Sequence, residues 1–124
     1  MNNSIIFAEN IRLWAHVGVL EKERIEGQLF LLNFSFSLDD QNASEEDDLS
    51  KSIDYASFIA EVRKLSKRIN CNTIERFSEE IINLFVKIYG EIPIKIVLKK
   101  VNPPVDGFNG MVGIIKSRNW IAIN

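Results

Sequence analysis

The sequence predicts an α+β fold: a four-stranded antiparallel sheet with two helices on one face, in the order ββααββ. Two observations carry this prediction. Residues 28–38 and 92–100 alternate between apolar and polar side chains with the two-residue period of a strand. Between them, residues 54–68 and a second segment that ends at Gly90 repeat their apolar side chains with the spacing of an amphipathic helix.

Four segments carry the pattern of strands. The first spans about 5–19 and is irregular near Glu9-Asn10. The second, residues 28–38, is the clearest, and its inward face is formed by Phe30, Leu32, Phe34, Phe36 and Leu38. The third is 92–100 and the last spans about 110–117. Because such a sheet has two open edges, and because apolar residues also occur on its second face, we expect that face to be partly covered and the edges to self-associate.

The two helices have recognisable ends. Asp54 is the expected N-cap of the first helix. Asn72 with Glu75 three residues later has the pattern of a capping box at the start of the second, and Gly90 ends it. The charged stretch 21–24 between the first two strands is predicted to be a loop.

A long acidic loop is expected at residues 39–51, a length that usually indicates function or mobility. It lacks the glycine-centred ligand spacing of an EF-hand, so calcium binding receives little support.

Composition excludes several functions. The 124 residues fit one domain, 1–124, with 46% hydrophobic and 26% charged residues. A net charge of −2 argues against general nucleic-acid binding, and the apolar runs are too short to cross a membrane. Cys71 and His16 are the only residues of their types, which excludes an internal disulfide and a zinc site with several such ligands. Without the pattern of a signal peptide at the N-terminus, a cytoplasmic location is expected.

Lys100 is the most informative single residue. It comes next in line on the apolar face of its strand, after Ile92, Ile94, Ile96 and Leu98. An ammonium group directed at a core is costly unless something there uses it. Asn102-Pro103-Pro104 then opens a stiff turn. Lys100 is therefore a candidate for proton transfer or anion binding; the simpler alternative is a strand-end lysine that reaches into water.

Three further residues have a functional and a structural interpretation. Glu23 is either a solvated charge or a loop carboxylate that reaches a pocket. Tyr55, in the first turn of its helix, is either a core aromatic or a cover for a flat ligand with a hydroxyl that moves protons. Glu75 either belongs to the capping box or binds the parallel N–H donors of an amino-pyrimidine ring. His16 is expected to be structural and Cys71 a partly buried, inert thiol.

Four separated stretches carry motifs. They are His16-Val17-Gly18-Val19-Leu20 with Glu23-Arg24 and Gly27-Gln28-Leu29-Phe30; Asp47-Asp48-Leu49 with Ile53-Asp54-Tyr55-Ala56; Asn72-Thr73-Ile74-Glu75-Arg76-Phe77; and Lys100-Val101-Asn102-Pro103-Pro104 with Val112-Gly113-Ile114. In this order and at these spacings they resemble the signatures of the dihydroneopterin aldolase family. The resemblance implies a tunnelling fold, in which the sheets of four subunits join into a barrel, two rings stack into an octamer, and pterin sites lie between subunits.

The resemblance also implies a binding site. Glu75 would hold the amino-pyrimidinone edge of the pterin, with main-chain groups of Ile74, Ile53 and Asp54 adding hydrogen bonds. Leu20 would make an apolar contact near the side chain of the substrate. The family's usual Leu-Leu is replaced here by Thr73-Ile74, which changes the shape of the pocket and keeps the main-chain contact.

The same resemblance implies the chemistry. Glu23, Tyr55 and Lys100 would be catalytic, with Tyr55 packing on the pterin from the neighbouring chain. The enzyme would cleave 7,8-dihydroneopterin by a retro-aldol reaction to 6-hydroxymethyl-7,8-dihydropterin and glycolaldehyde, in folate biosynthesis. The C=N bond of the ring accepts the electrons, so no cofactor, metal or Schiff base is expected. An epimerase acting on dihydroneopterin or its triphosphate, and a non-catalytic oligomeric binding module, are the alternatives.

Overall fold

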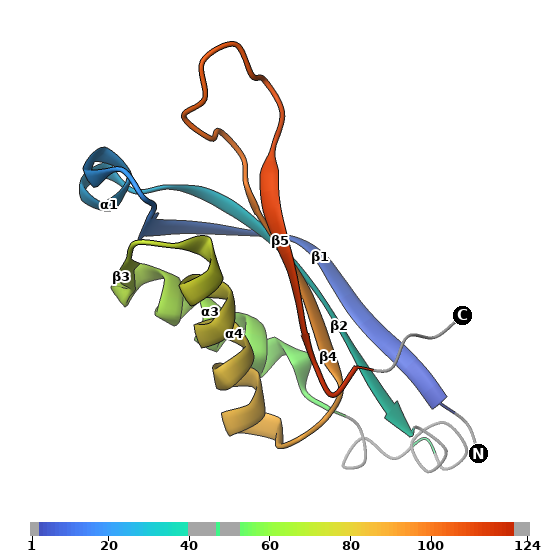
Figure 1. Ribbon diagram of the computed structural model, residues 1–124. Coiled ribbons are helices and arrows are strands. Elements are labelled where there is room, and N and C mark those ends of the chain that lie inside the picture. Colours follow the sequence, from blue (N-terminus) through green and yellow to red (C-terminus); the bar gives the residue numbers. More distant parts are fainter. Residues whose placement is uncertain (1–2, 40–46, 48–52, 121–124) are drawn as a thin grey trace.

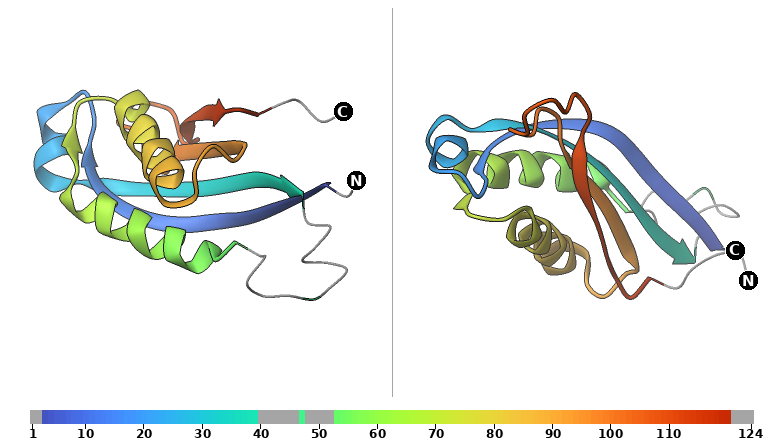
Figure 2. Two further views of the ribbon diagram at one scale, coloured as in Figure 1. Left: turned by 90° about the horizontal axis from the view of Figure 1, so that it is seen from below. Right: turned by 45° about the horizontal axis from the view of Figure 1, so that its top comes forward.

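The computed structural model of the protein describes residues 3–39, 47 and 53–120. Its elements form one curled sheet with two helices lying across one face (Figures 1 and 2). In chain order they are β1 (Asn3–Val17), α1 (Glu21–Glu26), β2 (Gln28–Asp39), α3 (Tyr55–Arg68), β3 (Asn70–Cys71), α4 (Ile74–Tyr89), β4 (Ile94–Lys100) and β5 (Val112–Arg118).

The sheet has five strands in the order β3-β1-β2-β4-β5. The pairs of β1 with β2, β2 with β4, and β4 with β5 are antiparallel, as the alternation predicts. The expected irregularity in β1 is present, because the register with β2 shifts between Ala8 and Ile11, and Asn10 has a φ of 62°. The N–H of Asn10 donates to Oδ1 of Asn33 at 2.7 Å, which fixes this bulge to β2.

The prediction of a purely antiparallel, four-stranded sheet is wrong in one respect. The fifth strand, β3, has two residues and pairs in parallel with the end of β1, where Val17 is opposite Cys71. A strand of this length shows no periodicity in the sequence, so alternation cannot reveal it. Its effect is to tie the segment between the helices to the edge of the sheet, since the N–H of Gly18 also donates to the carbonyl of Cys71 at 3.1 Å.

The stretch predicted to be a charged loop is the short helix α1. Its first turn is closed by Leu20, whose carbonyl accepts from the N–H of Glu23 at 3.0 Å and whose N–H donates to the Glu23 carboxylate at 3.1 Å. The Glu23 carboxylate thus supplies its half of a capping box, while Leu20 has no side-chain acceptor to supply the other half. Gly27, with a φ of 77°, ends the helix and leads into β2. Glu23 therefore projects from a helix instead of a loop.

The core lies between the sheet and the two long helices. The inward residues of β2, Phe30 to Phe36 in alternation, are fully buried against helix residues such as Phe58, Phe77 and Phe85. The rings of Phe34 and Phe58 meet edge to face with centroids 5.0 Å apart, and Phe30 meets Phe77 in the same way at 5.2 Å. This packing fixes the helices on the sheet and with them the start of each helix.

The predicted helix boundaries are confirmed except for one cap. Asp54 is the N-cap of α3, and its carboxylate accepts from the N–H of Ala56 at 3.1 Å. Gly90, with a φ of 85°, ends α4. The expected capping box of Asn72 and Glu75 is wrong: Thr73 is the N-cap of α4, and its hydroxyl accepts from the N–H of Arg76 at 3.1 Å. The side chain of Glu75 therefore does not cap the helix.

The second face of the sheet carries large apolar side chains that stay accessible in the described part of one chain. Phe7 on β1 is 63% exposed, Trp14 on the same strand 56%, and Ile115 on β5 67%. This face, expected to be partly covered, is not shielded by the helices, which lie on the other side (Figure 2). Among the described helices, none is long and apolar enough to cross a membrane.

Candidate active site

The centre of the candidate site is an ion pair between Glu23 and Lys100. Nζ of Lys100 lies 2.9 Å from Oε2 of Glu23, and their side chains are only 13% and 8% exposed. Lys100 is the last residue of β4 and lies opposite Phe30 of β2, on the helix-covered side of the sheet. Its direction is therefore the one that alternation predicts, and its ammonium group meets a carboxylate 77 residues away in the chain.

Glu23 is held as a carboxylate by three donors. Burial acts to raise its pKa, but the hydrogen bonds from Lys100, from the N–H of Leu20 and from the Gln28 amide, with the positive charge of Lys100, hold that pKa below its usual value. The Gln28 contact is 2.5 Å and also ends on Oε2. Glu23 is therefore a charged acceptor held 2.9 Å from the ammonium group of Lys100.

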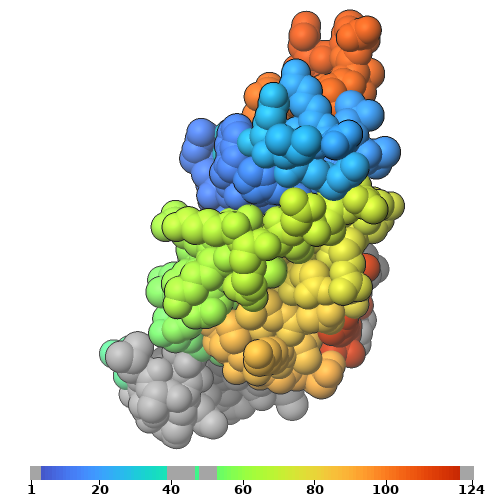
Figure 3. All heavy atoms as spheres, turned by 90° about the vertical axis from the view of Figure 1, so that its left-hand side faces the viewer, coloured from blue at the N-terminus to red at the C-terminus, as the bar shows by residue number. Residues whose placement is uncertain are grey.

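Side-chain contacts fix α1 to the end of β1. One guanidinium nitrogen of Arg24 donates to the carbonyls of Gly18 and Val19 at 2.8 and 2.7 Å. Nδ1 of His16 lies 2.9 Å from the carbonyl of Arg24. The predicted structural role of His16 is consistent with this contact. Seen from the helix side, α1 and the loop before β5 lie at one end of the molecule, beyond α3 and α4 (Figure 3).

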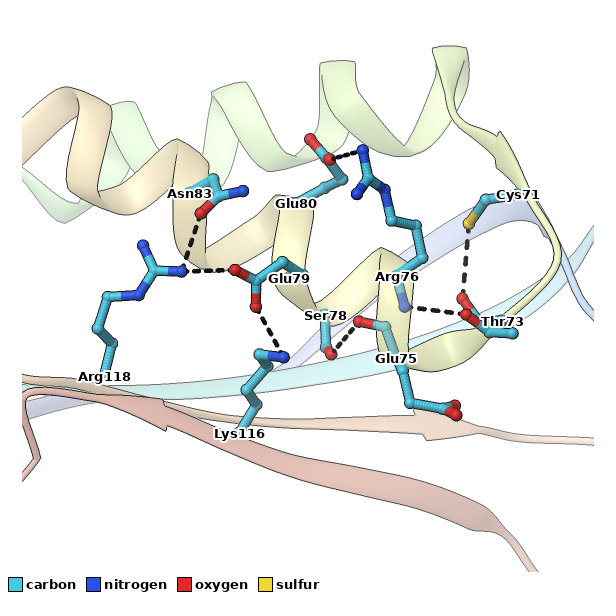
Figure 4. Close-up of polar contacts among 10 residues, drawn as sticks. All are labelled: Cys71, Thr73, Glu75, Arg76, Ser78, Glu79, Glu80, Asn83, Lys116 and Arg118. Atoms are coloured by element: carbon cyan, nitrogen blue, oxygen red, sulfur yellow. Dashed lines mark hydrogen bonds and ion pairs between the residues drawn. The ribbon is translucent and has the colours of Figure 1, made fainter.

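Glu75 and Tyr55 lie at the starts of the two long helices and are accessible. Tyr55 is the first residue of α3 and is 51% exposed. The carboxylate of Glu75 points away from Arg76 and Cys71 (Figure 4) and, among the described residues, makes no hydrogen bond or ion pair. The carbonyl of Glu75 accepts from the hydroxyl of Ser78 at 2.7 Å. Both predicted ligand-binding side chains are thus available, but neither contacts the pair of Glu23 and Lys100 within one chain.

The remaining predicted contact residues lie at these helix starts, except Leu20, which precedes α1. Ile74 is the first residue of α4, where main-chain N–H groups have no partner within the helix. Ile53 is half-buried, and its carbonyl accepts from the N–H of Tyr55 at 3.1 Å. The carbonyl of Asp54 accepts from the hydroxyl of Tyr89. Leu20, next to α1, is 48% exposed.

The hollow with the largest volume among those described in this chain lies elsewhere. It measures about 610 Å³ and opens between α1 and the end of α3, with His16, Arg24, Lys67, Arg68 and Asn70 in its wall. None of the predicted catalytic or binding residues lines it. In residues 3–39, 47 and 53–120, no three His, Cys, Asp or Glu side chains gather as a metal site. Within one chain, Glu23 and Lys100 are thus mostly buried, whereas Tyr55 and Glu75 are accessible, and this hollow contains none of the four.

Comparison with known proteins decides the family. The family model described as dihydroneopterin aldolase matches residues 6–116 of the chain. The chain belongs to the dihydroneopterin aldolase family. A dihydroneopterin aldolase of Streptococcus pyogenes serotype M1 is 33% identical over 113 residues, which cover 88% of this chain and 92% of the relative.

Solved structures of dihydroneopterin aldolases have the same fold. The E. coli dihydroneopterin aldolase in complex with neopterin superimposes with a TM-score of 0.83 at 23% identity, over 94% of this chain and 99% of that one. A Burkholderia dihydroneopterin aldolase bound to guanine gives a TM-score of 0.70 at 16% identity, over 94% and 90%. The prediction of a dihydroneopterin aldolase of folate biosynthesis is confirmed by the family match.

Three residues of the site of this family member are not apparent from the sequence pattern alone. Gln28 and Gly18 occur in the first motif, but nothing in their spacing indicates that both touch Glu23. Arg24 has the appearance of a surface charge, yet it anchors α1 through two carbonyls. Cys71 is partly buried as expected, and burial raises the pKa of its thiol.

Proposed function

We propose that the chain cleaves 7,8-dihydroneopterin by a retro-aldol reaction, releasing glycolaldehyde and 6-hydroxymethyl-7,8-dihydropterin. The observation that carries this proposal is the buried pair of Glu23 and Lys100, which lies within the part of the chain matched by the family model. Such a reaction needs a base for the hydroxyl proton of the substrate and an acid for the carbon left behind. The pair offers an acceptor and a donor within one hydrogen bond of each other.

Lys100 acts in this proposal through its protons and not as a covalent nucleophile. A Schiff base requires a neutral amine with a free lone pair, whereas the amine of Lys100 is ion-paired with Glu23 at 2.9 Å. The dihydropterin ring has a C=N bond next to the side chain that is cleaved. This bond takes up the electron pair when the carbon–carbon bond breaks, so the chemistry needs neither an imine to the protein nor a metal ion.

Glu75 is proposed to anchor the ring. A pterin presents two parallel N–H donors on its amino-pyrimidinone edge, and a carboxylate accepts both at once. Guanine presents the same edge, and the Burkholderia relative is a complex with guanine. The free main-chain N–H groups at Ile74, next to Glu75, add donors for the ring carbonyl. Leu20 and the main chain near Ile53 and Asp54 complete the proposed pocket.

The complete site is proposed to lie between subunits. Tyr55 and Glu75 are both accessible within one chain, and the uncovered apolar face with Phe7, Trp14 and Ile115 supplies a surface for association. Within the described residues β5 is an edge strand, whose outer edge offers main-chain groups to a strand of a neighbour. We propose a ring of four subunits whose sheets close into a barrel, two rings forming an octamer, with Tyr55 of one subunit covering the pterin held by Glu75 of the next.

A product assay tests the function. The purified protein is incubated with 7,8-dihydroneopterin, and glycolaldehyde and the pterin products are quantified by chromatography. Stoichiometric glycolaldehyde and 6-hydroxymethyl-7,8-dihydropterin are expected. An inverted stereoisomer without glycolaldehyde would assign the chain to the epimerases, and pterin binding without any product would make it a binding module. Sedimentation at several protein concentrations tests the assembly, with the Phe7→Asp variant expected to dissociate.

A further inference from the structure

Gln28, the first residue of β2, connects the end of β1 to the carboxylate of α1. Its Nε2 donates to the carbonyl of Val17 at 2.8 Å and to Oε2 of Glu23 at 2.5 Å. Both contacts end on acceptors, and the second reaches the same oxygen that meets Lys100. One amide group thus spans a fixed point of the sheet and the reactive pair.

The two acceptors determine which way the amide faces. If the group were turned over, Oε1 would face a carbonyl oxygen and a carboxylate oxygen, and neither has a proton to give. In the observed orientation Oε1 is buried and meets no donor among the described residues. An apolar side chain of similar shape would avoid burying such an acceptor. Such a side chain would also take this donor away from the carbonyl of Val17 and the carboxylate of Glu23, so the amide leaves one oxygen unpaired and in exchange holds both acceptors.

We infer that Gln28 is a positioning residue for the aldolase reaction, whose amide holds Oε2 of Glu23 in the orientation that meets Lys100. The inference rests on the proposed function, because it acts through the part that Glu23 plays in proton transfer. The hydrogen bond from the amide to the carbonyl of Val17 is essential to this inference. An amide bonded only to Glu23 would move together with the carboxylate and would not fix its position.

The charged surroundings allow the contribution of the amide to be isolated. Among residues 3–39, 47 and 53–120, Lys100 from β4 is the charged side chain that contacts Glu23. Arg24, on the same helix, is directed to the carbonyls of Gly18 and Val19, and His16 of β1 contacts the carbonyl of Arg24. None of these contacts involves Gln28. Replacing its amide therefore leaves the charges in place and removes one donor from the carboxylate, which favours the protonated form of Glu23.

The test compares Gln28→Met, which keeps the length and removes the donor, with the unmodified enzyme. We expect kcat at neutral pH to fall about tenfold while KM changes less than about threefold, and the acid limb of the kcat profile to move to higher pH by about one unit. Asn70→Leu, an amide-to-apolar change at an exposed side chain of β3, is the matched control and should leave the profile unchanged. An unshifted profile with unchanged kcat in Gln28→Met overturns the inference.

Two further measurements separate this inference from the proposed function. In a Glu23→Gln background, Gln28→Met should cause no additional loss of kcat, and additive losses would show that Gln28 does not act through Glu23. Independently of activity, the carboxyl carbon of Glu23 is titrated by 13C NMR, with Glu23→Gln to assign the signal. Gln28→Met should raise the pKa of Glu23, and an unchanged pKa rejects the inference even if the protein cleaves no pterin. If Gln28→Met does not fold, Gln28→Asn, too short to span both acceptors, takes its place.

Discussion

Gly18 and Glu23 are packed so closely that residue 18 has no room for a side chain. A Cβ atom at Gly18 would lie 2.3 Å from Cδ of Glu23 and 2.5 Å from its Oε1. The main chain of Gly18 has little freedom to withdraw, because its N–H donates to Cys71 and its carbonyl accepts from Arg24. The orientation of the carboxylate therefore depends on the absence of a methyl group five residues earlier in the sequence.

Gly18→Ala is expected to displace the Glu23 carboxylate and to separate it from Lys100. Small errors in the position of a catalytic group are costly, so we expect kcat to fall by about tenfold or more. The global fold should persist, as measured by circular dichroism. Val19→Ala is the control, because that side chain is 72% exposed, and its activity should be near that of the unmodified enzyme. A folded Gly18→Ala variant with unchanged kcat would contradict the proposed role of this geometry.

Most of the fold follows from the spacing of apolar residues, and the exceptions have physical reasons. The alternation in β2 and the helical period of α3 and α4 are visible because those elements are long and bury one face. The six residues of α1 are mostly charged and bury little besides Glu23, so no stripe marks them. A β3 of two residues is likewise too short for any period to show.

The sequence predicts the direction of Lys100 in the candidate site but not the contacts that it makes. The alternation of side chains along β4 predicts that Lys100 points toward the core. In the structure Lys100 lies on that face of the sheet, opposite Phe30. Alternation does not reveal that Glu23 is its partner, because the two residues are 77 positions apart in the sequence. They meet only because β2 pairs with β4 and α1 places Glu23 beside the end of β4. The contacts of Gln28 with Glu23 and Val17 depend likewise on how α1 folds back.

Lys100 and Glu75 should affect different kinetic constants. Lys100→Ala removes a proton donor, so we expect kcat to fall by about two orders of magnitude while the pterin dissociation constant changes much less. Glu75→Ala removes the proposed ring anchor and should mainly weaken binding. Turnover assays and fluorescence titration with a pterin separate the two effects. Normal turnover by Lys100→Ala would contradict the role of Lys100 as a proton donor. An unchanged pterin dissociation constant for Glu75→Ala would contradict the role of Glu75 as the ring anchor.

The pair of Glu23 and Lys100 should lose its contribution to stability in acid. Although burial acts to raise it, the pKa of folded Glu23 lies below the ordinary value of 4.5, because Lys100, Leu20 and Gln28 donate to the carboxylate. A lowered folded pKa stabilises the protein above the unfolded pKa, and that stability is lost as the pH falls through the folded value. We therefore expect Glu23→Gln to reduce the free energy of unfolding by about 2 kcal/mol near neutral pH and by clearly less in acid.

Urea unfolding at several pH values measures this difference. Glu26→Gln on the same helix is the control, because Glu26 is exposed and its replacement should change the free energy of unfolding little at any pH. A difference between the unmodified protein and Glu23→Gln that stays constant from neutral pH into acid would show that the ionisation of Glu23 does not contribute to stability.

Glu79 joins α4 to the edge strand β5. Its two carboxylate oxygens lie 2.7 Å from Nζ of Lys116 and 2.7 Å from the guanidinium of Arg118, which also donates to Asn83 at 2.9 Å (Figure 4). The hydrogen bond and charge of Lys116, with those of Arg118, lower the pKa of Glu79. About a third of each side chain is exposed, so solvent screens the attraction. We expect Glu79→Gln to cost about 1 kcal/mol at low salt.

Salt separates this bridge from ordinary packing. Ions screen exposed charges, so the cost of Glu79→Gln should shrink between about 0.05 and about 1 M salt, as measured by urea unfolding. Glu61→Gln is the control: Glu61 pairs with Lys64 within α3, where the side chains are 41% and 69% exposed, and its loss should cost less than about 0.5 kcal/mol. Because Glu79 lies one turn after Glu75, loosening α4 from β5 should also weaken pterin binding slightly. A cost that is independent of salt would assign the effect of Glu79→Gln to packing of the side chain and not to its charge.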